Sequence, residues 1–182
     1  MPQNQQNQQI PHRPDAPPKT AVLFVCLGNI CRSPTAHGVF TQQVAAAGLS
    51  HAIRTDSAGT GDWHLGEPPD RRTQHHAQQR NIDLSALRAR QVRPADFREF
   101  DYILAMDRQN LRDLQAMRPP TYAGTLALFL DYLNPENAGK KPKHQREVPD
   151  PYYGGADGFE QVLDLVEQAA RNLLREIAAQ LR

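Results

Sequence analysis

The sequence predicts an α/β domain built around a parallel sheet, and three observations support this. Residues 21–25 (AVLFV) and 102–106 (YILAM) are unbroken apolar runs, which are typical of strands buried on both faces of a sheet. Segments with a helical pattern follow each of these runs along the chain. An alternation of strands and helices implies parallel strands with helices on both faces of the sheet.

The first half of the domain carries start and stop signals. After the strand at 21–25 and a loop, Ser33 and Pro34 suit the N-cap and the first position of a helix. That helix is expected to run to about Ala47 and to stop at Gly48. It is followed by a short strand at 53–57, a loop at 58–66 and a helix at 69–80.

The second half continues the alternation. Asp107 follows the strand at 102–106 and is expected to cap a helix. A fourth strand is expected at 125–130, before a long polar connection at 134–149. Beyond it, apolar positions recur with the period of a helix, which predicts a long amphipathic helix over 158–182. They are Phe159, Val162, Leu163, Val166, Ala169, Ala170, Leu173, Leu174, Ile177 and Leu181.

Length and composition limit the class of protein. The 182 residues carry a net charge of +1 and include 2 cysteines, Cys26 and Cys31. This charge balance gives no sign of nucleic-acid binding, and no apolar run reaches the roughly 20 residues of a membrane span. The cysteine count excludes a disulfide-built scaffold and a four-cysteine metal site, and it fits a reducing compartment. Because the N-terminus lacks the apolar segment of a secretory signal, we expect a cytoplasmic protein.

Residues 1–19 are low in complexity and differ from the rest of the chain. Gln and Pro dominate this stretch, and Ile10 is its only large aliphatic residue. Such a segment cannot bury enough apolar surface to offset its ordering entropy, so we expect a disordered tail. Residues 20–182 then form a single domain. The tail either has a docking role or is an artefact of cloning or annotation.

The loop between the first strand and the first helix is the candidate site. It lies beyond the carboxyl end of a buried strand, where ligands bind in parallel sheets. It also runs into a helix N-terminus, which attracts anions. Gly28 and Asn29 tolerate the positive φ that curls amides inward, and the planar fork of Arg32 suits two phosphate oxygens.

Cys26 stands at the head of this loop and would lie under a bound anion. Helix N-termini and nearby cations favour the thiolate, and the Ser33 hydroxyl could donate a hydrogen bond to the sulfur. Loop amides and Arg32 would hold the oxygens of a phosphate monoester, with phosphorus in line with the sulfur. The structural alternative is a buried cysteine in a strand–helix turn.

Displacement of an alkoxide or phenoxide by sulfur requires a general acid, and Asp150 is the strongest candidate. Pro149 and Pro151 stiffen the backbone around it. Tyr152 and Tyr153 follow and could form the wall of a slot for a flat ring. An ordinary Pro-Asp-Pro turn with tyrosines packed on the domain explains this segment equally well.

With both segments in view, the chain resembles the low-molecular-weight protein tyrosine phosphatase family. The signature loop of the family is similar to residues 25–34, and its acid loop is similar to residues 150–154. Further matching segments stand in the family's order at 56–60, 69–70, 89–91 and 100–107. The resemblance implies a four-stranded parallel sheet flanked by helices on both faces, a flavodoxin-like three-layer sandwich. It also implies an enzyme without metal or cofactor.

The resemblance implies hydrolysis of phosphotyrosine on proteins through a phosphocysteine intermediate. Cys26 would be the nucleophile, and Arg32 would bind the phosphate and stabilise the transition state. Asp150 would protonate the tyrosyl oxygen and then deprotonate the attacking water. Ser33 would tune the thiolate. The candidate substrate-binding residues are Leu27, Gly28, Asn29, Ile30, Cys31, Ser33, Trp63, Tyr152 and Tyr153.

Residues around the loop include departures from the family pattern. Asn29 would hold the strained shape of the loop, with Ser57 in the supporting network. His37 stands where the family often has an acidic residue, and we expect little catalytic effect. Arg80 occupies the region where some members carry a histidine that supports the loop through Asn29. The basic connection at 134–149 is either a solvated loop or an electrostatic guide for acidic phosphopeptides.

Three other activities compete with tyrosine phosphatase activity. Arsenate reduction, which some relatives perform on the same loop, needs further cysteines downstream, and none follows Cys31. Protein-arginine phosphatases resemble this loop but carry Thr in place of Ile30, so Ile30 favours tyrosine. The third alternative is a non-catalytic phosphotyrosine-binding module, but Cys26 and Asp150 are both present, and nothing suggests lost catalysis.

Cys31 stands in the same curled loop as Cys26. It could capture an oxidised Cys26 as a reversible disulfide, or it could be a small buried filler. His75 and His76 lack a set of metal-binding partners and are expected on the surface of a helix. The expected partners are phosphotyrosine proteins, with no nucleic acid and no membrane, and we expect a monomer. A cognate tyrosine kinase as partner rests on analogy with bacterial relatives.

Overall fold

The computed structural model describes residues 17–133 and 146–181. At its centre, four parallel strands form a sheet in the order β2-β1-β3-β4. The central pair is β1 and β3, and Cys26, the last residue of β1, pairs with Gly59 at the end of β2. The strands are β1 (Thr20–Cys26), β2 (Ile53–Gly59), β3 (Tyr102–Ala105) and β4 (Thr125–Leu128).

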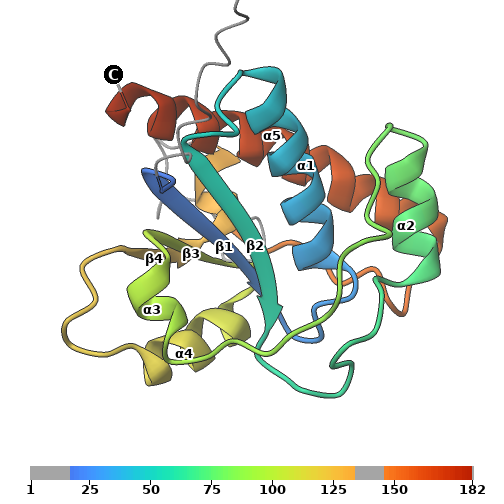
Figure 1. Ribbon diagram of the computed structural model, residues 1–182. Helices are drawn as coiled ribbons and strands as arrows, with labels where there is room; N and C mark the ends of the chain where they lie inside the picture. Colours follow the sequence, from blue (N-terminus) through green and yellow to red (C-terminus); the bar gives the residue numbers. More distant parts are fainter. Residues whose placement is uncertain (1–16, 134–145, 182) are drawn as a thin grey trace, which may run out of the picture.

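Helices cover both faces of this sheet, as predicted (Figure 1). On one face, α1 (Arg32–Ala46) packs against the long α5 (Ala156–Gln180), which also contacts the 3₁₀ helix η1 (Phe129–Leu133). The short α3 (Asp96–Glu99) and α4 (Arg108–Met117) lie on the other face. α2 (Arg71–Gln78) packs against α5. The sequence therefore predicted the three-layer architecture correctly.

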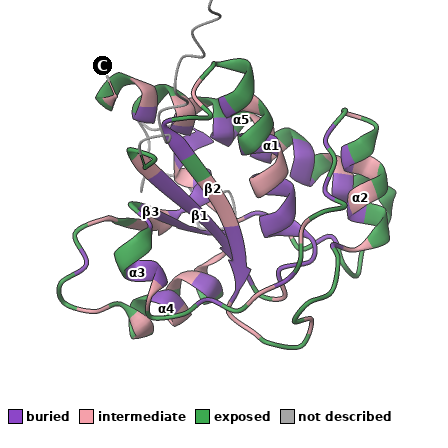
Figure 2. Cartoon of the chain, in the orientation of Figure 1, coloured by how far each residue is buried: buried purple, intermediate pink, exposed green. Residues whose placement is uncertain are grey.

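The alternating side chains of β1 divide the core into two layers. Val22 and Phe24 face the α1 and α5 layer, whereas Leu23 and Val25 face the α3 and α4 layer. All four are fully buried, and Figure 2 shows buried residues along most of the central strands. The Phe24 ring also meets the Phe129 ring edge-on, with 4.9 Å between centroids. Burial on both faces explains why this strand is an unbroken apolar run.

The strand boundaries differ from the prediction, most of all at the ends of β2 and β4. β2 continues past the predicted end at 57 to Gly59, because it pairs with β1 along its whole length. β4 ends at Leu128, and the predicted strand residues 129–130 belong to η1. A short apolar run does not distinguish a strand from a buried helical turn, which explains this error.

The helices also differ in detail from the prediction. The helix predicted at 69–80 is shorter, and Asp70 caps it by accepting hydrogen bonds from the N–H groups of Arg72 and Thr73. α3 was not predicted, since its 4 residues are too few to show a helical period. Gly48 ends α1 with a φ of 71°, as its predicted role requires.

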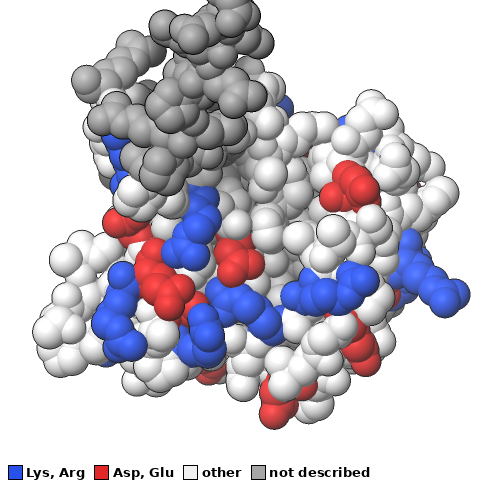
Figure 3. All heavy atoms as spheres, viewed as in Figure 1, with Lys and Arg blue, Asp and Glu red and all other residues white. Residues whose placement is uncertain are grey.

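The predicted tail and the predicted polar connection lie largely outside the described residues. Of the tail, only 17–19 are described, and of the connection, only 146–149. On the face shown in Figure 3, acidic and basic side chains are interspersed, as a net charge near zero implies. In the part of the chain that the structure describes, no helix combines the length and the apolar character of a membrane span.

Candidate active site

The loop between β1 and α1 curls around the Cys26 sulfur. Asn29 has a φ of 56°, and its N–H donates a hydrogen bond to the Cys26 Sγ at 3.2 Å. The Ser33 Oγ lies 3.0 Å from the same sulfur. An asparagine tolerates this left-handed conformation better than most residues, which explains why it stands at the turn of the loop. The loop thus places one main-chain donor and one hydroxyl group at the sulfur.

Hydrogen bonds from neighbouring segments hold this loop in shape. The Asn29 side chain donates from Nδ2 to the Ser33 Oγ at 2.9 Å and accepts at Oδ1 from the N–H of Arg90 at 2.9 Å. On the other side, Gly59 lies so close that a Cβ there would meet the Leu27 carbonyl oxygen at 2.6 Å. The end of β2 therefore supports the loop, and only glycine fits at this position.

Several backbone N–H groups of the loop are available to a ligand. In the described part of the chain, the N–H groups of Gly28, Ile30 and Cys31 make no hydrogen bond. They stand between the sulfur and the start of α1, where the helix dipole also favours a negative charge. Unpaired main-chain donors beside a helix N-terminus are suited to an anion such as phosphate.

Arg32 lies between two carboxylates at the first turn of α1. It donates from Nη1 to the Asp107 carboxylate at 2.6 Å and from Nη2 to the Asp150 carboxylate at 3.3 Å. Burial alone would lower the pKa of Arg32, but the Cys26 sulfur, Asp107 and Asp150 outweigh it and raise the pKa. The guanidinium is therefore a permanent cation beside the sulfur.

Asp150 enters the site from the far end of the chain. Val148, two residues before it, is fixed just beyond the end of β3 by a hydrogen bond from its N–H to the Met106 carbonyl oxygen at 2.8 Å. The Asp150 carboxylate accepts from the Tyr152 N–H at 3.1 Å and is 44% exposed, whereas Arg32 is 5% exposed. An exposed carboxyl group beside a buried guanidinium can reach a leaving group at the mouth of the site.

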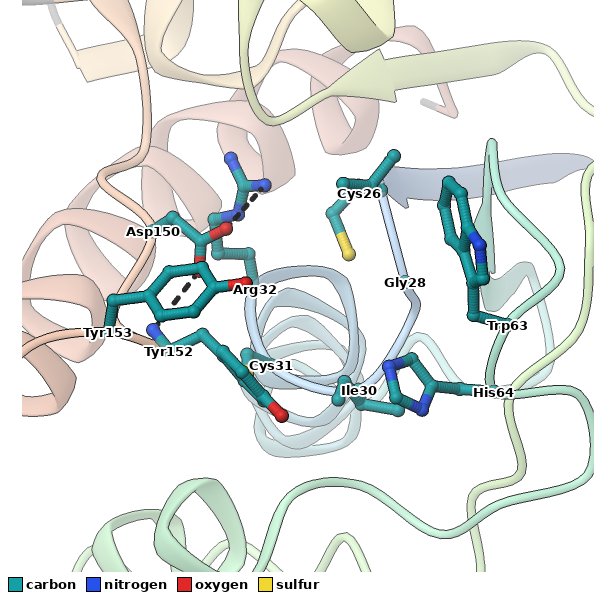
Figure 4. Close-up of a pocket in the computed structure, with 11 residues that line it drawn as sticks. Cys26, Gly28, Ile30, Cys31, Arg32, Trp63, His64, Asp150, Tyr152 and Tyr153 are labelled. Carbon is teal, nitrogen blue, oxygen red and sulfur yellow. Dashed lines mark hydrogen bonds and ion pairs between the residues drawn. The ribbon is translucent and has the colours of Figure 1, made fainter.

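The walls of the pocket are aromatic and apolar. Figure 4 shows Trp63 and His64 on one side of the Cys26 sulfur and Tyr152 and Tyr153 on the other. The predicted residues Leu27, Gly28, Ile30, Cys31, Trp63, Tyr152 and Tyr153 all line this pocket. Trp63 and Tyr153 are 68% and 92% exposed, so they form the rim rather than the floor.

The sequence analysis missed two residues at this site. His64 lines the pocket, and its Nδ1 lies 2.7 Å from the Glu67 carboxylate. Asp107 was predicted only as a helix cap, a role that its hydrogen bond from the Asn110 N–H confirms, but it also binds Arg32. The pairing of Asp107 with Arg32 had no local signal because 75 positions separate them.

Ser33 is not the N-cap of α1, as the sequence had suggested. The N-cap is Cys31, without a side-chain hydrogen bond, and Ser33 lies inside the first turn. Its hydroxyl instead meets the Cys26 sulfur and the Ala58 carbonyl oxygen, the latter at 3.3 Å. The first N–H groups of the helix thus have no side-chain cap and remain at the pocket.

The supporting network also differs from the one expected. Arg80 lies away from the loop and forms ion pairs with three carboxylates of α5, including Glu160. The Ser57 Oγ lies 3.2 Å from His37 Nδ1 and makes no hydrogen bond to Asn29 in the described structure. The Arg90 N–H therefore supports Asn29 in place of the expected side chain.

The remaining titratable residues that the structure describes do not form a metal site. No group of three or more His, Cys, Asp or Glu side chains among the described residues could hold a metal ion. His76 was expected to be a free surface residue. Instead, its Nδ1 lies 2.6 Å from the Glu160 carboxylate and its ring stacks on Phe159. Cys26 and Cys31 are free and buried thiols, and burial raises the pKa of Cys31 to about 12.

Known proteins share this chain's sequence and fold. The family described as low molecular weight phosphotyrosine protein phosphatase matches residues 21–182. The low molecular weight phosphotyrosine protein phosphatase of Schizosaccharomyces pombe is 43% identical over 86% of this chain and 96% of its own. A crystal structure of a protein tyrosine phosphatase from Entamoeba histolytica matches with a TM-score of 0.79 and 36% identity, over 90% of this chain and 99% of that chain.

A more distant neighbour has a different name. The Drosophila arginine phosphatase matches with a TM-score of 0.76 and 30% identity, over 86% of this chain and 96% of that chain. A sulfur surrounded by main-chain donors and faced by an arginine and an aspartate is typical of cysteine-dependent phosphatases. The chain belongs to the low molecular weight phosphotyrosine protein phosphatase family and is a protein tyrosine phosphatase.

Proposed function

We propose that Cys26, Arg32 and Asp150 catalyse the hydrolysis of phosphotyrosine through a phosphocysteine intermediate. The observation that carries this proposal is the Cys26 sulfur, which accepts a hydrogen bond from the Asn29 N–H beside unpaired loop amides. A thiolate is the nucleophilic form of cysteine, and in this position it faces the site where the phosphate would bind.

In the first step, the Cys26 sulfur attacks phosphorus, and the bond between phosphorus and the tyrosyl oxygen breaks. The Arg32 fork and the N–H groups of the loop hold the other three phosphate oxygens as charge develops on them. Protonated Asp150 donates its proton to the departing tyrosyl oxygen. The products of this step are the dephosphorylated tyrosine side chain of the substrate protein and phosphocysteine.

In the second step, water hydrolyses the intermediate. The Asp150 carboxylate, now ionised, takes a proton from the attacking water. The water oxygen bonds to phosphorus, and the bond between sulfur and phosphorus breaks. The products of this step are inorganic phosphate and the Cys26 thiolate. The Ser33 hydroxyl, whose Oγ lies 3.0 Å from the sulfur, stabilises the thiolate. Asp150 carries its proton again, so the cycle is complete.

The depth and walls of the pocket support selectivity for aryl phosphates. Cys26 is 3% exposed, whereas Trp63 and Tyr153 stand at the rim. A phosphoseryl group is too short to reach a recessed sulfur, but a phosphotyrosyl ring spans the distance between rim and floor. The ring would lie between Trp63 and the tyrosine pair, where aromatic contacts favour it.

Phosphoarginine is the competing substrate, because one structural neighbour is an arginine phosphatase. Ile30 argues for tyrosine, since an apolar side chain on the pocket wall gives a guanidinium no hydrogen-bond acceptor. A non-catalytic binding module would not need the acid, yet Asp150 lies beside Arg32 in the site.

A competition assay tests this function. Purified protein is incubated with equal amounts of phosphotyrosine, phosphoserine and phosphoarginine peptides of otherwise identical sequence, and phosphate release from each is followed. We expect release from phosphotyrosine alone in the wild type and from none in Cys26→Ser. Preferred release from phosphoarginine, or activity in Cys26→Ser, would contradict the proposal.

The proposal also covers the extent of the domain, its location, its oligomeric state and its partners. We propose that residues 20–182 act as one phosphatase domain in the cytoplasm and as a monomer, on phosphotyrosine proteins that include a cognate tyrosine kinase. The two free thiols are in keeping with a reducing compartment, and every residue proposed for catalysis comes from one chain. Light scattering on the purified protein tests the monomer.

A further inference from the structure

The start of α2 is hydrogen-bonded to the loop that carries Asp150. Arg72 donates from Nη1 to the Tyr152 carbonyl oxygen at 3.2 Å. Its Cζ also lies 5.4 Å from the Tyr152 ring centroid and 5.0 Å from that of Phe159, within the range of cation–π attraction. Within the described ranges, no other hydrogen bond joins residues 151–154 to an element outside the loop.

Asp70 fixes the direction of the Arg72 guanidinium. The two side chains form a fork, with Arg72 Nε 3.1 Å and Nη2 3.0 Å from the two Asp70 carboxylate oxygens. Burial would raise the pKa of Asp70, but its hydrogen bonds from Arg72 and Thr73 outweigh it and lower the pKa. The pair is thus ionised at neutral pH, and Nη1 is left to face Tyr152.

The same aspartate connects Arg72 to the loop around the nucleophile. The Asp70 N–H donates to the Ile30 carbonyl oxygen at 2.8 Å. A continuous path therefore runs from the loop that holds the Cys26 sulfur, through Asp70 and Arg72, to the carbonyl group of Tyr152. This path ties two segments that lie more than a hundred positions apart in the sequence.

Tyr152 transmits the contact to the general acid. Its N–H donates to the Asp150 Oδ1 at 3.1 Å, while its carbonyl oxygen accepts from Arg72. Both hydrogen bonds involve main-chain groups of Tyr152. A shift of the Tyr152 carbonyl group therefore also moves the Tyr152 N–H, which holds the Asp150 carboxyl group. Gly154 and Gly155 follow Tyr153, so the chain on this side of Tyr152 is free to adopt many backbone conformations.

The other restraint on Asp150 is Arg32, which has a competing task during the reaction. The Arg32 Nη2 lies 3.3 Å from the Asp150 carboxylate, yet the same guanidinium must bind the phosphate of the substrate. When Asp150 is protonated and the phosphate is bound, this ion pair no longer holds the acid. The contact of Arg72 with the loop involves neither the phosphate nor the carboxyl group and persists.

We propose that Arg72, oriented by Asp70, is a positioning residue that holds the Asp150 loop so that the acid reaches the leaving oxygen. The proposal rests on the proposed function, since it assigns Arg72 a role only if Asp150 is the general acid. Arg72 itself touches neither substrate nor reacting atoms. It acts on the first step, in which the leaving group takes a proton.

The test compares Arg72→Gln with the wild type on two substrates that differ in their need for an acid. Dinitrophenyl phosphate has a leaving group that departs without protonation, whereas phenyl phosphate requires a proton from Asp150. The measured quantity is kcat/KM, which reports the steps up to breakage of the P–O bond. For phenyl phosphate we expect a loss of roughly 10- to 100-fold, because a displaced acid transfers its proton poorly.

For dinitrophenyl phosphate, we expect Arg72→Gln to lower kcat/KM by about twofold or less, since phosphate binding is unchanged. Arg72→Lys keeps the charge but lacks the fork, so its loss with phenyl phosphate is expected to be smaller than that of Arg72→Gln. Arg71→Gln is the matched control. Arg71 is the neighbouring arginine on α2, is exposed, and forms no hydrogen bond or ion pair within the described structure.

Asp150→Asn separates failure of this inference from failure of the proposed function. If Asp150→Asn lowers kcat/KM for phenyl phosphate and Arg72→Gln causes no further loss in that background, the two residues act through one group, as proposed. Equal losses of Arg72→Gln on both substrates, or a phenyl phosphate rate equal to that of Arg71→Gln, would overturn the positioning role alone. An unchanged rate in Asp150→Asn would overturn both proposals.

Discussion

At the scale of single residues, the chemistry depends on contacts of about 3 Å around one sulfur and one carboxyl group. The Cys26 sulfur meets the Asn29 N–H at 3.2 Å and the Ser33 Oγ at 3.0 Å, and Asp150 faces Arg32 at 3.3 Å. Each of these partners has a distinct task. Substitutions at single positions should therefore remove one of these tasks at a time.

Replacement of Asp150 by asparagine removes the acidic proton and keeps the size of the side chain. We expect Asp150→Asn to lower kcat/KM for phenyl phosphate by about 10²–10⁴, the usual contribution of a general acid. Steady-state kinetics with phenyl phosphate measure this loss, and circular dichroism checks that the fold is retained. An undiminished rate would place the acid at another residue.

The two cysteines should differ in reactivity even though they share one loop. Burial raises the pKa of Cys31 to about 12, so Cys31 remains a thiol at neutral pH and reacts slowly. We expect iodoacetate at neutral pH to label Cys26 and to leave Cys31 unlabelled in the folded protein. Mass spectrometry of proteolytic fragments locates the label. Equal labelling of Cys31 would show that its burial does not suppress the thiolate.

Much of the site could be predicted at this scale, because Cys26, Arg32 and Asp150 lie in short segments with unusual local sequences. The contacts of Arg32 with Asp107 and of Arg72 with Tyr152 could not be predicted, since they join residues 75 and 80 positions apart. The prediction that Ser33 caps the helix was wrong because its hydroxyl suits both a helix cap and a hydrogen bond to sulfur. Only the tertiary fold brings the Cys26 sulfur within reach of this hydroxyl.

At the scale of the elements, the loop is rigid because three of them support it. β2 approaches it at Gly59, the segment after α2 binds Asn29 through the Arg90 N–H, and α4 holds Arg32 through its own N-cap, Asp107. Asp107 thus has two tasks, one for the helix and one for the site. Substitutions there can separate stability from activity.

The two tasks of Asp107 separate in a pair of variants. Asparagine caps a helix about as well as aspartate, so Asp107→Asn should cost less than about 1 kcal/mol of unfolding free energy. It removes the charge that holds Arg32, and we expect kcat/KM for phosphotyrosine to fall by roughly tenfold or more. Asp107→Ala should show the same kinetic loss and a further loss of about 1 kcal/mol in stability.

Urea unfolding and steady-state kinetics measure these two quantities separately. An Asp107→Asn variant with wild-type kinetics would mean that the ion pair with Arg32 does not position the guanidinium.

The strands could be predicted at this scale because burial on both faces leaves a continuous apolar run, as in β1. The end of β4 could not, since the mostly apolar segment Phe129–Leu133 fits a strand and a 3₁₀ helix equally well.

At the scale of the whole molecule, alternating strands and helices predicted the three-layer fold, but not the partly buried polar groups that lie between a helix and the sheet. His37 on α1 lies against Ser57 of β2 and is such a group. Burial lowers the pKa of His37. The negative charge of Asp56 raises this pKa and the positive charge of Arg90 lowers it, and the net effect is a lowered pKa. The folded protein therefore holds His37 neutral, while the unfolded chain binds a proton below about pH 6.5.

This difference in proton binding links folding to pH. Since the unfolded state binds more protons, the contribution of His37 to the unfolding free energy is present above about pH 6.5 and is lost as the pH falls below it. We expect His37→Gln to reduce the loss of stability between about pH 7 and pH 5. Urea unfolding across this range measures it, and an unchanged pH dependence in the variant would contradict the assignment.

The central claim is that Cys26 carries the phosphoryl group during turnover. Rapid mixing of the protein with a phosphotyrosine peptide, followed by quenching and fragmentation mass spectrometry, tests it directly. We expect one added phosphoryl group, on the sulfur of Cys26. A phosphoryl group found on Cys31 or on any other side chain instead, with Cys26 unmodified, would contradict it.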